Sequence, residues 1–189
     1  MVVNTLYLDA GILKSARTIY NKQNPKNLRL ENFFQKPVYA LLQKKLEKAK
    51  YSLKFHPYKY KYSIAKVKEV NSFLNGQYFA KIIKTIIRFK KSKLKYEIRK
   101  FERGNYTLLH DAEKEKPGID FILSFSKNNN NFGGYNVYLT EHVELLQLEP
   151  FPNSISFVER KKGVMKFMKY VQHRQKFPII QIIGTVARK

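Results

Sequence analysis

The feature of this sequence that most restricts its fold is a series of short apolar runs in its second half. Between Gly104 and Val171, β-branched and aromatic runs alternate with Gly, Pro and Asn at intervals of roughly 8–12 residues. These runs are short for helices and are bounded by turn residues, as in an all-β sandwich or barrel. The second half of the chain therefore predicts a core made of sheets.

Eight strands can be assigned from this pattern. They are residues 94–101, 106–109, 119–125, 137–139, 143–148, 154–158, 164–171 and 179–186. Eight is the strand number of a jelly roll, which has two sheets packed face to face. We expect apolar side chains to fill the space between these sheets.

Several short phrases in this half resemble a known family. They are Tyr106-Thr107-Leu108-Leu109-His110-Asp111, Gly133-Gly134-Tyr135, Pro152-Asn153-Ser154 and Lys166-Phe167-Met168-Lys169-Tyr170-Val171, preceded at the N-terminus by Asn4-Thr5-Leu6-Tyr7-Leu8-Asp9. In order and spacing they resemble the 2-oxoglutarate- and iron-dependent prolyl hydroxylases that modify a ribosomal protein. The similar part is their second, C-terminal double-stranded β-helix domain.

The resemblance implies an α+β fold. This fold is a double-stranded β-helix, a cupin-like jelly roll, with an N-terminal helical layer packed on one side. We expect a single domain over residues 1–189, with a basic helical part at 1–91 and the jelly roll at 92–189. The pair Gly133-Gly134 predicts a tight approach between strands.

The first half of the chain contains helical patterns. One helix is predicted over residues 9–20, a second begins at residues 30–34, and a third has Pro37 in its first turn. In the third helix an apolar stripe lies opposite Lys44, Lys45, Lys48 and Lys50. The clearest pattern covers residues 76–91, with isoleucines on one face and basic residues on the other. Such a helix can lie on an anionic membrane. We expect its isoleucines to pack on a sheet instead.

The resemblance implies where an active enzyme would hold its iron. Two histidines and one carboxylate form such a site, and the first histidine and the carboxylate lie two residues apart. Here these two positions hold His110 and Ala112, and alanine cannot bind a metal. The position of the second histidine aligns with Lys166, whose ammonium has no lone pair. The basic residue expected to bind 2-oxoglutarate is also missing, because residues 179–186 contain no Lys or Arg.

We therefore expect no cofactor and no catalysis, as in a pseudoenzyme. An active hydroxylase that binds Fe(II) and 2-oxoglutarate through unusual ligands remains the alternative. No other catalytic chemistry is indicated. The chain has no cysteine, and its four histidines lack the spacing of metal ligands on a helix.

Charge is the strongest global feature of the chain. Its formal net charge is +23, and residues 1–104 hold 25 of the 37 basic residues but only 6 of the 14 acidic ones. Such a surface attracts polyanions. The predicted polyanion-binding residues are Lys81, Lys84, Arg88, Lys90, Lys91 and Lys93.

Residues 51–62 alternate between aromatic and basic side chains, which predicts a strand pair broken at His56-Pro57. Two interpretations remain open. The aromatic rings can stack on unpaired bases while the lysines neutralise phosphates. Alternatively, the strand is half-buried and its lysines are merely solvated.

Two functions follow as hypotheses. The chain begins where the C-terminal domain of the resembled enzymes begins, so we expect the catalytic half to be absent. The first hypothesis is a scaffold that binds RNA, the ribosome or a protein of the translation machinery. The alternative is an accessory subunit of a separately encoded catalytic domain. No apolar run is long enough to span a membrane, and no signal peptide is visible, which predicts an intracellular protein, cytoplasmic or nuclear.

Overall fold

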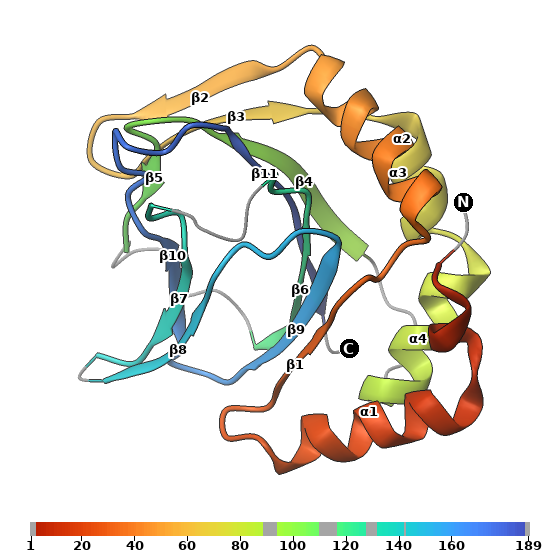
Figure 1. The fold of residues 1–189 in the computed structure, drawn as a ribbon. Helices are drawn as coiled ribbons and strands as arrows, with labels where there is room; N and C mark the ends of the chain where they lie inside the picture. The colour runs from red at the N-terminus through yellow and green to blue at the C-terminus, as the bar shows by residue number, and fades with distance from the viewer. Residues whose placement is uncertain (1–2, 89–93, 110–116, 128–131, 142, 188–189) are drawn as a thin grey trace.

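The computed structural model describes residues 3–88, 94–109, 117–127, 132–141 and 143–187. Two antiparallel sheets face each other, and helices cover the outer side of the larger sheet (Figure 1). The architecture is the predicted α+β double-stranded β-helix. None of the helices in the described ranges is long and apolar enough to cross a membrane.

The larger sheet has eight strands in the order β1-β9-β6-β11-β4-β3-β2, with β5 paired to β3. Every pairing in it is antiparallel. Its strands are β1 (Asn27–Leu30), β2 (Ser52–His56), β3 (Tyr60–Ala65), β4 (Leu94–Phe101), β5 (Tyr106–Thr107), β6 (Gly118–Ser124), β9 (Ser154–Arg160) and β11 (Ile179–Ala187).

The smaller sheet closes the barrel from the other side (Figure 1). Its order is β10-β7-β8, with β7 at Asn136–Leu139, β8 at Glu144–Leu148 and β10 at Met165–Met168. The Thr107 hydroxyl of β5 accepts a hydrogen bond from the Met168 amide of β10, at 2.6 Å. This bond connects the two sheets at one corner of the barrel.

The helices form a layer on one side of the molecule, as predicted (Figure 1). They are the 3-10 helix η1 (Thr5–Leu8), α1 (Ala10–Lys22), α2 (Lys36–Lys48), α3 (Lys68–Leu74) and α4 (Gln77–Ile87). Asp9 caps α1, because its carboxylate accepts a hydrogen bond from the Ile12 amide at 2.8 Å. The Pro37 ring occupies the first turn of α2, where no amide hydrogen is needed.

The packing of α4 confirms the prediction from its periodicity. Ile82, Ile83 and Ile86 are at most 6% exposed. Phe79 of the same helix meets the Phe121 ring of β6 edge to face, with centroids 5.2 Å apart. Burying these side chains stabilises the fold by roughly 1.5–3 kcal/mol for each large apolar residue.

The central strand β6 separates two apolar cores. All seven of its residues are buried. Phe121 packs in the core under the helices, whereas Ile122 packs in the core between the sheets. Because side chains alternate along a strand, the run 119–123 supplies both cores at once.

The segment after β1 corrects one prediction. Residues 30–34 do not begin a helix; β1 pairs with β9, and the chain then bends at residues 31–32, where Asn32 has a φ of +49°. Asn153 fixes this path, because its side-chain amide both accepts from the Phe34 amide and donates to the Phe34 carbonyl, each at 2.9 Å. This contact gives Pro152-Asn153-Ser154 a structural role. Tertiary pairing therefore overrides local helix preference here.

The other predicted elements are confirmed in outline. A strand overlaps each of the eight predicted runs, although β5 is shorter than expected. Residues 51–62 do form a strand pair, β2 and β3, which joins the large sheet. The approach at Gly133 is tight, because an added Cβ would lie 1.9 Å from the Tyr170 carbonyl oxygen and its φ is +84°.

Candidate functional site

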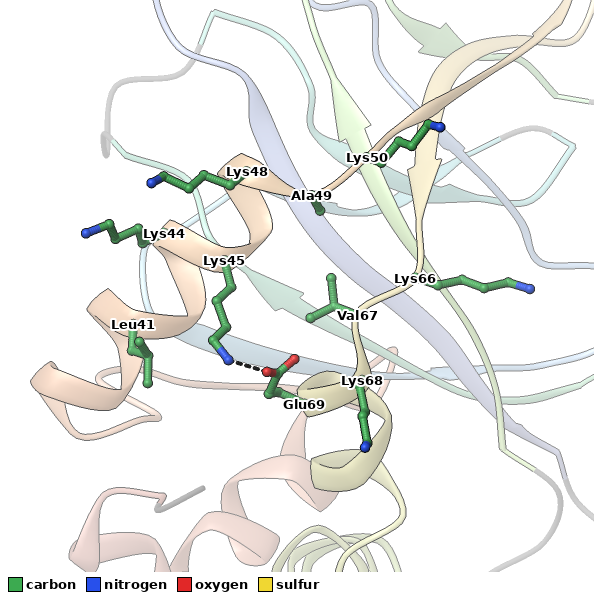
Figure 2. Close-up of a pocket in the computed structure, with 10 residues that line it drawn as sticks. All are labelled: Leu41, Lys44, Lys45, Lys48, Ala49, Lys50, Lys66, Val67, Lys68 and Glu69. Carbon is green, nitrogen blue, oxygen red and sulfur yellow. Dashed lines mark hydrogen bonds and ion pairs between the residues drawn. The ribbon is translucent and has the colours of Figure 1, made fainter.

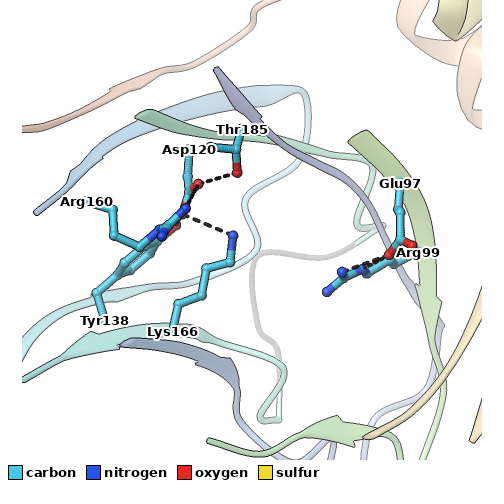
Figure 3. A network of polar contacts seen from close by, with 7 residues as sticks. All are labelled: Glu97, Arg99, Asp120, Tyr138, Arg160, Lys166 and Thr185. Atoms are coloured by element: carbon cyan, nitrogen blue, oxygen red, sulfur yellow. Dashed lines mark hydrogen bonds and ion pairs between the residues drawn. The ribbon is translucent and has the colours of Figure 1, made fainter. Parts of the chain in front are cut away.

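The barrel interior contains a buried cluster of charged side chains, which corrects the prediction of a purely apolar filling. Its centre is Asp120 of β6, whose side chain is fully buried. Arg160 of β9 and Thr185 of β11 approach from the large sheet, and Tyr138 of β7 and Lys166 of β10 approach from the small one (Figure 3). The cluster thus links both sheets through one carboxylate.

Both oxygens of Asp120 accept hydrogen bonds. Oδ1 accepts from Thr185 Oγ1 at 2.6 Å and from an Arg160 terminal nitrogen at 3.3 Å. Oδ2 accepts from Arg160 Nε at 3.1 Å, from Lys166 Nζ at 3.1 Å and from the Tyr138 hydroxyl at 3.3 Å. A carboxylate offers about four acceptor positions, so this one is saturated.

The electrostatics follow from this geometry. Burial alone would raise the pKa of Asp120, but the charges of Lys166 and Arg160, with hydrogen bonds from Arg160 and Thr185, lower it to about 2. Asp120 is therefore ionised at neutral pH. Two cations, Arg160 and Lys166, share this one carboxylate.

A second charged network lies near the first, and Figure 3 draws two of its members, Glu97 and Arg99 of β4. Glu97 pairs with Arg99 at 2.7 Å and with Lys54 at 3.0 Å. Burial favours the neutral acid, yet the charges of Arg99 and Lys54 and their hydrogen bonds lower the pKa of Glu97. The Arg99 guanidinium also stacks on the Tyr62 ring, 4.6 Å from its centroid.

A small cavity of about 120 Å³ lies between the two networks. Polar groups from both sheets line it, among them Arg99, Asn136 and Lys166. Lys166 is the predicted metal-site position that the structure describes, and it lies in the interior, as the resemblance implied for the second ligand. His110 and Ala112 lie outside the described residues.

The described residues around this cavity do not fit an iron ion. The Lys166 ammonium has no lone pair, and Asp120 has both oxygens engaged with donors. Within the part of the chain that the structure describes, no group of three or more His, Cys, Asp or Glu side chains is placed to hold a metal. We therefore derive no iron-dependent step from these residues.

The predicted polyanion-binding residues are only partly within the described chain. Lys81, Lys84 and Arg88 are exposed on or directly after α4; we call these three the α4 patch. Lys81 Nζ donates to the Leu8 carbonyl at 3.1 Å, so it is partly engaged. Lys90, Lys91 and Lys93 lie outside the described residues.

A larger group of cations surrounds a groove of about 530 Å³ between α2 and α3 (Figure 2). We call this feature the lysine groove; its lysines are Lys44, Lys45, Lys48, Lys50, Lys66 and Lys68. Glu69 is the acidic residue in its lining, and it pairs with Lys45. The other five lysines make no ion pair with any residue in the described ranges.

Comparison with known protein families shows which family this chain belongs to. A family model described as "Oxoglutarate and iron-dependent oxygenase degradation C-term" matches residues 54–187. The chain belongs to this family. The match covers most of the chain, including the small sheet and the large sheet from β3 through β11, and confirms the resemblance seen in the sequence phrases.

Relatives in the family include two enzymes named prolyl 3-hydroxylase OGFOD1. The chain is 33% identical to the Mus musculus protein over 82 residues and 30% identical to the Xenopus laevis protein over 84 residues. Each alignment covers 41% of this chain, but only 15% and 16% of the respective relative. The activities of those whole proteins therefore do not transfer directly to this chain.

Solved structures share the fold at low sequence identity. A Pseudomonas putida prolyl-4-hydroxylase superposes with a TM-score of 0.70 at 10% identity, covering 94% of this chain and all of that one. A Trichoplax adhaerens prolyl hydroxylase bound to a peptide of hypoxia inducible factor gives 0.67 at 10% identity, covering 96% and 91%. This domain is thus a prolyl hydroxylase-like member of the 2-oxoglutarate oxygenase fold.

The sequence pattern did not identify the buried charged cluster around Asp120 as a site. Asp120 was part of a predicted strand but was given no role, and Arg160 was not noticed. A signal was present, because Asp120 is the one charged residue in the run Gly118-Ile119-Asp120-Phe121-Ile122-Leu123. A charge within a strand buried on both faces requires a partner, which could have been sought among the later strands.

Proposed function

We propose that this domain is a non-catalytic binding module that docks on RNA, including ribosomal RNA, through its basic helical side. The observation that carries the proposal is the lysine groove, where five lysines lack an acidic partner in the described chain. Unpaired surface cations in such number attract phosphate through counterion release. The role proposed is docking rather than chemistry.

The interior of the barrel supports the non-catalytic part of the proposal. The position implied for an iron-binding histidine holds Lys166, which bonds to Asp120 instead. Arg99 and Lys166, the cations that border the cavity, already face carboxylates of the chain itself. The charges that could bind a dicarboxylate co-substrate are therefore largely neutralised from within.

A direct test measures binding at about 0.1 M salt. Fluorescence anisotropy detects binding of labelled ribosomal RNA, and co-sedimentation detects binding to purified ribosomes. We expect saturable binding that weakens steeply as salt is added. In parallel, anaerobic calorimetric titration with Fe(II) or Mn(II) should show no 1:1 site. A folded protein that ignores RNA and ribosomes at this salt concentration contradicts the proposal.

A second candidate rests on the names of the relatives. Both are prolyl 3-hydroxylases, and each is matched over only a small part of its length. The domain can therefore act as an accessory subunit that pairs with a separately encoded catalytic domain. Co-purification of such a domain with this chain, and hydroxylase activity that depends on both, would favour this candidate over RNA docking.

A further inference from the structure

We propose that the lysine groove and the exposed face of the adjacent β2–β3 hairpin form one continuous surface for single-stranded RNA. This inference deepens the function proposed above and rests on it. It places the principal contact away from the α4 patch. It also specifies unpaired bases, which a purely electrostatic surface does not recognise.

The groove and the hairpin are joined by the chain itself. Lys50 lies between α2 and β2, and Lys66 lies between β3 and α3 (Figure 2). Both lysines line the groove, so the groove opens at the base of the hairpin. From Lys50 to Phe55 the backbone runs about 17 Å at the ordinary rise of a strand.

Strand pairing shows which face of the hairpin is open. Ala65 lies opposite Ile98, which belongs to the core under the helices. Ser63 lies two residues from Ala65 and opposite Leu53, so Leu53 and then Phe55 lie on this same helix-side face. The helices leave this part of the face uncovered, because Leu53 is 63% and Phe55 58% exposed.

Aromatic rings and cations alternate along the hairpin as far as its tip. Tyr58, in the turn between β2 and β3, is 81% exposed, and its ring meets the His56 ring edge to face with centroids 6.5 Å apart. Lys61 lies directly opposite Phe55 in the strand pair, and Lys59 follows Tyr58. Every base has a π face, so exposed rings beside a cationic groove bind single strands with little sequence preference.

This arrangement favours one class of partner over others. A base-paired duplex hides its base faces, and an acidic protein offers carboxylates but few flat rings. An anionic membrane would need a continuous apolar stripe. Here each exposed apolar residue of β2 lies opposite a polar one, Leu53 opposite Ser63 and Phe55 opposite Lys61. Single-stranded RNA uses both the cations and the rings.

The experiment compares four double variants of the full chain. Lys48→Glu with Lys66→Glu alters the groove, and Phe55→Ala with Tyr58→Ala removes the two rings. Lys84→Glu with Arg88→Glu alters the α4 patch, and Lys14→Glu with Lys22→Glu on α1 is a control with the same change in charge. All eight side chains are exposed, and circular dichroism checks that each variant folds.

Affinity is measured by anisotropy with a labelled oligouridylate of about 20 nucleotides, longer than the roughly 4–16 nucleotides of comparable sites. A duplex of equal length, poly-glutamate and vesicles containing phosphatidylserine are the other probes. We expect the ring variant to lose at least about fivefold for the single strand and nothing for the duplex. We expect the groove variant to reduce the slope of log affinity against log salt concentration by roughly 1.4 in magnitude. Two phosphate contacts are lost, and each contributes about 0.7 to this slope for a single strand.

Other results overturn the inference in distinguishable ways. If the wild type binds RNA but the α4 variant loses as much affinity as the groove variant, the assignment to the groove is wrong. If the ring variant binds oligouridylate normally, or if poly-glutamate or vesicles compete as well as RNA does, the surface is not one for single strands. If the wild type binds no RNA, the proposed function itself fails.

Discussion

The barrel interior and the helix-side surface use the same type of residue in opposite ways. Inside, Lys166 and Arg160 converge on Asp120, and Arg99 and Lys54 converge on Glu97. On the surface, the lysine groove gathers six lysines around Glu69 alone. A cation that must be buried requires a fixed carboxylate, because desolvation is costly, whereas an exposed one can remain available to a partner.

The comparison predicts that the interior is intolerant of charge loss. Replacing Asp120 with Asn should destabilise the fold by about 3–5 kcal/mol, because Arg160 and Lys166 both lose an ion pair to this buried carboxylate. Urea denaturation measures this loss. The double variant Asp120→Asn with Lys166→Met should recover part of it, since one of the two cations that paired with Asp120 is then gone. Equal stability of Asp120→Asn and wild type would mean that the interior cluster does not hold the sheets together.

The surface should instead respond strongly to salt. With roughly six phosphates contacted, RNA affinity should fall by about 10³ between 50 and 200 mM salt. The stability of the fold should change far less over this range, because the buried pairs are poorly screened. Anisotropy and thermal denaturation in the same buffers separate the two effects. A flat salt response would show that the surface lysines do not bind phosphate.

Acid should act on the interior through Asp120. Its pKa is about 2 in the folded state, below the ordinary value of 3.8, so its contribution to stability is complete above about pH 4. It should be lost as the pH falls through about 2, at a cost of roughly 2 kcal/mol. Denaturation between about pH 5 and pH 2 should therefore show a shallower loss for Asp120→Asn than for wild type. Parallel curves would indicate that this carboxylate is not selectively ionised.

The smallest change in stability is expected on the α4 patch. Reversing Lys84 and Arg88 to Glu should alter the free energy of unfolding by less than about 0.5 kcal/mol, because both side chains are exposed. RNA binding should weaken by a similar factor for any sequence, since phosphate contacts carry no base information. Anisotropy with two unrelated RNAs measures the factor by which the affinity for each one falls. An unfolded variant would mean that these side chains pack rather than bind.

The elements that were predicted correctly depend on local pattern. The run at 94–101 coincides with β4, and the isoleucine spacing of α4 identified its buried face. Both signals lie within a single segment and report directly on which face meets the core. Residues 30–34 were misassigned because their conformation is determined by Asn153, 119 residues away in the sequence.

The site was harder to predict for the same reason. The cluster around Asp120 draws one side chain from each of five strands, and no local window contains more than a few of them. The lysine stripe of α2 was visible in the sequence. Its continuation through Lys66 and Lys68 was not, because these residues reach the groove only when α3 packs beside α2.

The position of β1 has a practical consequence for anyone who divides this protein. The family match starts at residue 54, yet β1 at Asn27–Leu30 covers the edge of β9 and is held there beside the Asn153 contact. A fragment cut at residue 54 would expose β9 as a hydrophobic edge strand with unpaired amides, which invites aggregation between copies. The same cut removes α1 and α2, so insolubility of that fragment would report the loss of both the protective strand and the helical cover of the large sheet.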